Sequence, residues 1–155
     1  MQKLVLYSTL CLILFAACNK DKFQDKPTIE IKSINPTQVS AFSGSYSEIN
    51  LEFTDKQGDL DSVFLYKMWL NSRGRTAQFP ILPFPLPTFP EKNKGEIKLT
   101  LVSAFALVAA QNPSPQTGSP NNKEPDTIFF KIIVKDKAGN VSDTATTDPL
   151  VIERS

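Results

Sequence analysis

Apolar and polar residues alternate along several stretches of this chain, and a period of two is the mark of a β-strand with one buried face. The clearest alternating stretches are 28–34 (TIEIKSI), 49–54 (INLEFT) and 95–101 (GEIKLTL). The stretch 127–135 (TIFFKIIVK) is the most strongly strand-like, with apolar residues on both faces. The stretch 63–70 (VFLYKMWL) is almost continuously apolar, which predicts a strand covered on most of both faces, with Trp69 in the core.

Polar turns separate these stretches, notably 55–61 (DKQGDLD) and 136–140 (DKAGN). Segments 38–42, 141–147 and 150–152 predict short additional strands, and 111–125 reads as a long polar loop. No segment beyond the first 17 residues has a helical period, and no repeat is present. About seven short strands without helices predict one all-β domain, an antiparallel immunoglobulin-like β-sandwich.

Five prolines interrupt residues 79–90 (FPILPFPLPTFP). Proline excludes a helix and removes the N–H donors of a β-ladder, so this segment is expected to be extended and polyproline-like. Two interpretations stay open. The segment packs on the sandwich and blocks an edge strand. Alternatively it is an exposed strip that binds a partner through Phe79, Phe84, Leu86 and Phe89.

The N-terminus has the form of a secretory leader. Residues 1–17 carry one cation, Lys3, followed by an apolar run that suits a signal peptide better than a membrane span. The run ends in Phe-Ala-Ala-Cys, which resembles the lipobox of bacterial lipoproteins, with Phe15 where leucine is usual. The resemblance implies cleavage before Cys18 and acylation of its thiol. An ordinary secretory signal with a coincidental cysteine is the alternative.

The resulting organisation is a signal peptide (1–17), a lipidated cysteine with a polar tether (18–27) and a sandwich domain (28–155). Two further segments carry a family resemblance. Residues 131–144 (KIIVKDKAGNVSDT) resemble the last hairpin of bacterial immunoglobulin-like and cadherin-like domains. Residues 51–62 (LEFTDKQGDLDS) are similar to an acidic turn of extracytoplasmic Bacteroidota lipoproteins, with Gln57 in place of an acid. The resemblance implies an outer-membrane lipoprotein of the cell envelope, facing the periplasm or the cell surface.

Composition excludes several chemistries. The chain contains no histidine, which removes Ser-His-Asp and Cys-His nucleophiles and every histidine-bearing metal site. Without the leader, 16 basic residues balance 16 acidic ones, so no electrostatic footprint for nucleic acid exists. Beyond the leader Cys18 is the only thiol, and no intramolecular disulfide can form. We therefore expect no enzyme, but a binding or structural domain with a protein or glycan partner.

The acidic turns are the candidate site. In an immunoglobulin-like sandwich the loop after the second strand and the last hairpin lie at the same end. Oxygen ligands for calcium would then come from Asp55, Asp59, Asp61, Asp136 and Asn140. Cadherin-like modules bind calcium through acidic loops, so the resemblance also implies this metal. The alternative is that these residues only form turns. A third hypothesis, a hydrolase using Asp59 and Asp61 as paired carboxylates, rests on residue type alone.

Overall fold

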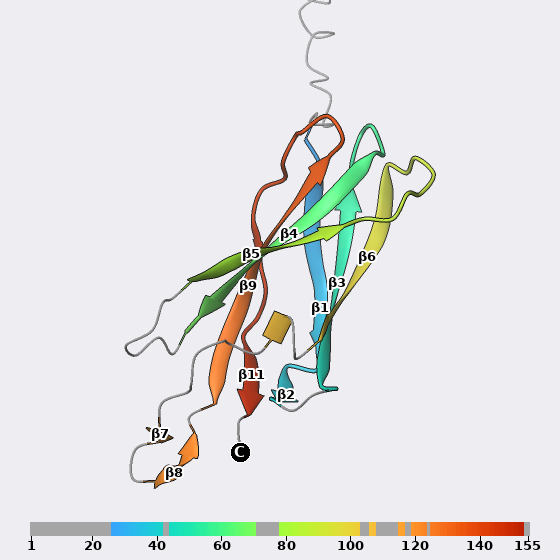
Figure 1. The fold of residues 1–155 in the computed structure, drawn as a ribbon. Coiled ribbons are helices and arrows are strands. Elements are labelled where there is room, and N and C mark those ends of the chain that lie inside the picture. Colours follow the sequence, from blue (N-terminus) through green and yellow to red (C-terminus); the bar gives the residue numbers. More distant parts are fainter. Residues whose placement is uncertain are drawn as a thin grey trace, which may run out of the picture.

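The computed structural model describes residues 26–41, 44–70, 78–102, 106–107, 115–116, 119–123 and 125–153, and only the backbone at 78–80, 115–116 and 119–123. Figure 1 shows the fold. The described strands are β1 (Thr28–Asn35), β2 (Gln38–Ser40), β3 (Tyr46–Thr54), β4 (Leu60–Trp69), β5 (Gln78–Pro85), β6 (Lys94–Val102), β7 (Pro115–Gln116), β8 (Ser119–Lys123), β9 (Asp126–Asp136), β10 (Ala145–Thr146) and β11 (Leu150–Glu153). No helix among the described residues is long and apolar enough to cross a membrane.

Two sheets face each other, which confirms the predicted all-β sandwich. The smaller sheet has the order β1-β3-β6, and the larger has the order β2-β11-β9-β4-β5, with β10 also paired to β9. The pairings are antiparallel except for the short parallel contact between β2 and β11. These two sheets contain more than the seven or so strands predicted, because the proline-rich segment and the two-residue β10 also pair. The hairpin β7–β8 occupies part of the segment expected to be a loop.

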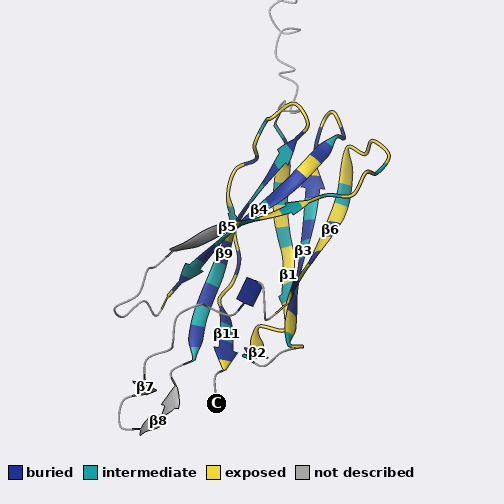
Figure 2. Cartoon of the chain, viewed as in Figure 1, coloured by how far each residue is buried: buried dark blue, intermediate teal, exposed yellow. Residues whose placement is uncertain are grey.

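The period-two alternation places one face of each long strand in a common core. Strands β3 and β9 alternate buried and less buried residues along their whole length (Figure 2). The fully buried side chains of the core include Ile49, Leu51, Val63, Leu65, Leu101, Ile128, Phe130, Ile132, Val134, Leu150 and Ile152. Trp69 is also in this core, as predicted. The opposite face of β4 is only half-buried, so the double cover expected there is partial.

The proline-rich segment differs from expectation because part of it is a hydrogen-bonded strand. β5 pairs antiparallel with β4 at the edge of the larger sheet. Just beyond it, the Leu86 N–H donates to the Asp61 carbonyl at 2.9 Å, so this N–H faces β4. Successive N–H groups of a strand alternate sides, which places the positions of Pro83 and Pro85 on the outer side. Pro83 and Pro85 therefore cost no ladder bond and remove two N–H donors from the outer edge of β5.

The segment 141–147, predicted as a polar edge strand, pairs with β9 only at Val141 and in β10. Between and beyond these points hydroxyl groups replace the missing ladder bonds. The Ser142 Oγ accepts a bond from the Val134 N–H, and the Thr147 Oγ1 accepts one from the Phe130 N–H, both at 3.0 Å. The side chains of this segment thus satisfy buried donors of β9 that a regular strand would satisfy with carbonyls.

Candidate metal centre

Two acidic segments meet at one end of the sandwich. Leu60, which begins β4, pairs with Asp136, which ends β9. The β3–β4 loop therefore lies beside the turn that follows β9, at the upper end in Figure 1. β1 begins at the same end, because Thr28 pairs with Thr54. The expectation that these two loops share one end is confirmed.

The β3–β4 loop is held in a tight turn by its own groups and by the segment that connects β5 to β6. The Asp59 N–H donates to the Asp55 Oδ2 at 2.8 Å. Gly58 has a φ of +71°, and a Cβ there would lie 2.6 Å from the Lys92 nitrogen, so only glycine fits. The Asp55 N–H donates to the Asn93 carbonyl at 2.9 Å. The crossover between β5 and β6 thus fixes the backbone that carries Asp55 and Asp59.

The turn after β9 is organised around Asp136. Its Oδ1 accepts the Asn140 N–H at 2.7 Å, and its Oδ2 accepts the Asn140 side-chain amide at 2.8 Å. Gly139 supplies the positive φ of +91° that closes the turn. The Lys137 N–H donates to the Asp59 carbonyl at 3.1 Å. This last bond ties the two acidic segments together directly.

The result is a cluster of three carboxylates, which we call the Asp cluster: Asp55, Asp59 and Asp136. Each offers an oxygen, and these oxygens all lie within 4.8 Å of one another. Asp55 is 3% exposed and Asp136 is 1% exposed. The Oδ1 atoms of Asp55 and Asp59 are buried and accept no hydrogen bond. Buried carboxylate oxygens normally have partners, so these two atoms require an explanation.

Burial and like charge both act on Asp59. Burial is the larger cause that raises the pKa of Asp59, and the charges of Asp55 and Asp136 raise it further. The nearby Lys137 opposes these effects in part. A bound proton or a bound cation at the cluster would relieve the repulsion that remains.

The remaining predicted ligands lie differently. Asp61 is the extra residue where the β4–β9 register shifts, and it is exposed, outside the Asp cluster. Because such a bulge re-aims its side chain, the spacing in sequence was misleading. Asn140 contacts the cluster only through Asp136, to which it donates. Asp59 belongs to the Asp cluster and Asp61 does not, although both residues line one small cleft beside Lys137.

No sequence signal indicated the contribution of the crossover. Gly58 and Asp55 are anchored by Lys92 and Asn93, which are more than thirty residues away along the chain. The Asn93 side-chain amide also donates to the Lys56 carbonyl at 2.9 Å. Contacts of this kind depend on how β5 connects to β6, and alternation of residues does not report it.

The proline-rich strip packs mostly inward. Phe84, Leu86 and Phe89 are half-buried and contact the core. The rings of Phe89 and Phe53 lie 6.3 Å apart at an angle of 54°. The Phe79 side chain lies outside the described residues, and Ile81 is 46% exposed. This arrangement is the one expected if the strip covers the sandwich.

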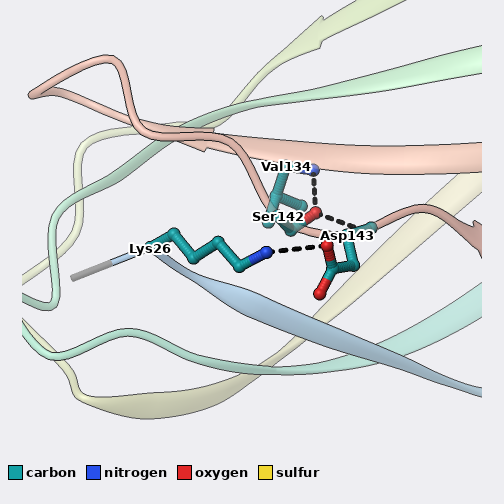
Figure 3. A network of polar contacts seen from close by, with 4 residues as sticks. All are labelled: Lys26, Val134, Ser142 and Asp143. Carbon is teal, nitrogen blue, oxygen red and sulfur yellow. Dashed lines mark hydrogen bonds and ion pairs between the residues drawn. The ribbon is translucent and has the colours of Figure 1, made fainter. Parts of the chain in front are cut away.

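The chain enters the sandwich at the end that carries the Asp cluster. The Lys26 Nζ lies 2.7 Å from the Asp143 Oδ1, and the Ser142 Oγ donates to the Asp143 carbonyl while accepting from Val134 (Figure 3). Lys26 thus joins the entry of β1 to the segment that follows the β9 turn. Cys18 and the rest of residues 1–25 lie outside the described residues.

Comparisons with known proteins assign no family. No protein-family model matches the chain. No curated protein matches it. Among solved structures, the chain is similar to the β-glucosidase from Listeria innocua in complex with gluconolactone, with 11% identity and a TM-score of 0.42. The complex of that enzyme with glucose gives 11% identity and a TM-score of 0.43. Both likenesses cover 83% of this chain and 16% of the enzyme chain.

Proposed function

We propose that this protein is a non-enzymatic, immunoglobulin-like binding or structural module of the cell envelope whose loop end binds a divalent cation, calcium by its chemistry. The observation that carries the cation site is the pair of buried, unpartnered Oδ1 atoms of Asp55 and Asp59. Together with Asp136 they offer hard oxygen ligands and three formal negative charges in one place.

The number of carboxylates in the Asp cluster favours calcium, and their spacing is compatible with it. Calcium holds its oxygens at about 2.4 Å, so two of its ligands can be separated by up to about 4.8 Å. The cluster oxygens lie within 4.8 Å of one another, which fits this shell. Magnesium holds oxygens at about 2.1 Å in a strict octahedron, gives up its water reluctantly and usually binds through one or two carboxylates, so a site with three carboxylates suits it less well. Three side-chain oxygens leave room for water and backbone oxygens among the six to eight that calcium takes.

The role proposed for the cation is structural. Asp55 and Asp59 belong to the β3–β4 loop, and Asp136 belongs to β9 in the same sheet as β4. The loop is also bonded to Asn93, just before β6 of the other sheet. A cation at the Asp cluster would therefore fix the junction of both sheets at the end where β1 begins. A lipid anchor at Cys18 would place this end toward the membrane.

The test is thermal unfolding of residues 26–155, which contain every described strand. We expect about 5 mM Ca²⁺ to raise the melting temperature by about 6 °C over EDTA, if the dissociation constant is about 0.5 mM, as in extracellular modules. The same concentration of Mg²⁺ should have a smaller effect. An unchanged melting temperature in Ca²⁺ would refute the cation site and leave a shared proton as the occupant of the cluster.

The chain offers a matched pair of variants for this test. Asp55→Asn removes one charge of the Asp cluster, and its amide oxygen can still accept the Asp59 N–H. Asp61→Asn removes the same charge from the same region, outside the cluster. The calcium response should be lost in Asp55→Asn and kept in Asp61→Asn. Equal loss in both would indicate diffuse attraction of cations and no built site.

A lipid anchor is tested separately by labelling cells that express the whole chain with a fatty-acid probe. The proposal predicts label on the wild type and none on Cys18→Ser. Label that persists in the variant would refute acylation at this cysteine.

A further inference from the structure

One edge of the sandwich is open, while the others are protected. The smaller sheet has β1 and β6 as its two edge strands, and the larger sheet has β2 and β5. β2 has only three residues, β1 carries a register shift, and the outer side of β5 is blocked by proline. β6 has nine residues with no proline, and among the described strands it pairs with β3 alone. Exposed residues run along it on the outside of the molecule (Figure 2).

The charges on this edge are not all balanced within one copy of the chain. Glu96 lies directly opposite Glu52 across the β3–β6 pair. Glu52 has cations from both sides, since Lys94 lies 3.1 Å and Lys32 lies 3.7 Å from its Oε1. No ion pair involves Glu96 within the described part of the chain. Like charges opposite each other in a sheet are destabilising, so Glu96 gains from a cation supplied on its open side.

Lysine on an edge strand usually discourages pairing with another chain. Here Lys94 and Lys98 are both engaged by carboxylates of β3, Lys98 with Glu48 at 2.8 Å. Their charges are balanced inside the sheet, and the alternation Lys94, Glu96, Lys98 leaves no single sign along the edge. This protection is therefore weak on β6.

We propose that β6 pairs antiparallel with β6 of a second copy, about a two-fold axis at Ile97. In that register Glu96 of each copy faces Lys98 of the other, so both charge pairs are complementary. Lys94 faces Thr100, and residues 94–100 all pair. A register centred one residue later would oppose Lys98 with itself. The surface thus fits a second copy of this chain through its own charge pattern.

An apolar cleft at the same place supports an occupied edge. It has a volume of about 310 Å³ and opens beside Glu96, Ile97 and Lys98, the residues at the proposed axis. Its apolar lining includes Phe53 and Phe89. Pairing of the two β6 strands brings two such clefts together and removes apolar surface from water, which a hydrogen-bonded edge alone would not do.

The proposal is tested by sedimentation equilibrium of residues 26–155 in EDTA, so that the outcome is independent of the cation site. Between about 1 and about 500 µM we expect a dimer with a dissociation constant on the order of 10–100 µM. Glu96→Lys and Lys98→Glu each turn two attractive contacts into repulsive ones. Each should raise the dissociation constant by on the order of tenfold or more.

Three further samples make the test specific. The two single variants mixed together should form a heterodimer, because every contact is then again between opposite charges. The double variant Glu96→Lys/Lys98→Glu should dimerise like the wild type. Lys94→Glu is the matched control: it breaks an ion pair with β3 as Lys98→Glu does, but it faces Thr100 and should leave the dimer intact.

Loss of folding cannot imitate the result for Glu96→Lys, because that change places a cation opposite Glu52. A wild type that stays monomeric up to about 500 µM would overturn the proposal and leave the open edge to an extended segment of a different chain. A dimer that Glu96→Lys does not weaken would overturn it as well.

Discussion

Asp59→Asn should stabilise the domain in the absence of calcium and destabilise it in the presence of calcium. Without a cation, the carboxylate of Asp59 is repelled by Asp55 and Asp136, which Lys137 offsets only in part, and its Oδ1 makes no hydrogen bond. With a cation, the same oxygen is a ligand. The amide of asparagine removes the charge, and the backbone bond from position 59 to the Asp55 Oδ2 does not depend on the side chain.

The size of the effect follows from the distances. Two unit charges 4.8 Å apart, the upper limit in the Asp cluster, repel by about 0.9 kcal/mol in a water-like medium and by about 3.5 kcal/mol at an effective dielectric of about 20. Asp59 is only partly buried, so the lower value is appropriate for each of its two neighbours. Lys137 offsets part of the sum. We expect Asp59→Asn to stabilise the cation-free domain by about 1 kcal/mol, or about 4 °C.

The pH dependence has a defined sign. The pKa of Asp59 in the folded state lies above the ordinary aspartate value of 3.8, because of burial and the two neighbouring charges. The folded state therefore binds more protons than the unfolded state between these two pKa values. This contribution to stability is present below pH 3.8 and is lost as the pH rises through the raised pKa. Because asparagine does not titrate, Asp59→Asn should remove this loss of stability at rising pH.

The assay is thermal unfolding followed by circular dichroism, in EDTA and in about 5 mM Ca²⁺, from about pH 4 to about pH 8. In EDTA at neutral pH the variant should melt above the wild type, and in Ca²⁺ it should melt below it. A variant that melts below the wild type in EDTA would show that Asp59 makes a stabilising contact, and the repulsion argument would be wrong. A full calcium response in the variant would place the ion elsewhere.

Two further substitutions test the supports of the site. Gly58→Ala should cost about 2–3 kcal/mol in urea unfolding, from a positive φ and from a Cβ 2.6 Å from the Lys92 nitrogen. Gly44 has a φ of +96°, and a Cβ there would have no atom within 4 Å, so Gly44→Ala should reduce stability only through backbone strain. An equal loss of stability in the two alanine variants would disprove the clash at Gly58. Ser142→Ala should cost about 1–3 kcal/mol, because the Val134 N–H loses its acceptor. Ser142→Thr keeps the hydroxyl and should restore most of that stability; a similar loss there would mean that the hydroxyl is not the cause.

The sequence was sufficient for the fold class because alternation is a local property. In β3 and β6 each second residue is apolar, and burying one face of each strand leaves few architectures besides a sandwich. The expectation that the turn after β3 and the turn after β9 share one end came from the topology of an immunoglobulin-like sandwich. Glycine and aspartate in these turns could be recognised from residue type and spacing.

Strand pairing determined several features of the fold and the site that residue type could not predict. Asp61 leaves the cluster because the β4–β9 register shifts at that residue, and β5 tolerates its prolines because it lies at an edge. The anchoring of Gly58 by Lys92 and the open edge at Glu96 depend on neighbours from distant parts of the chain. Period and composition report which face of a strand is buried. Only the tertiary structure reports which strand lies beside it, and that neighbour determines where a carboxylate meets another carboxylate, a cation or water.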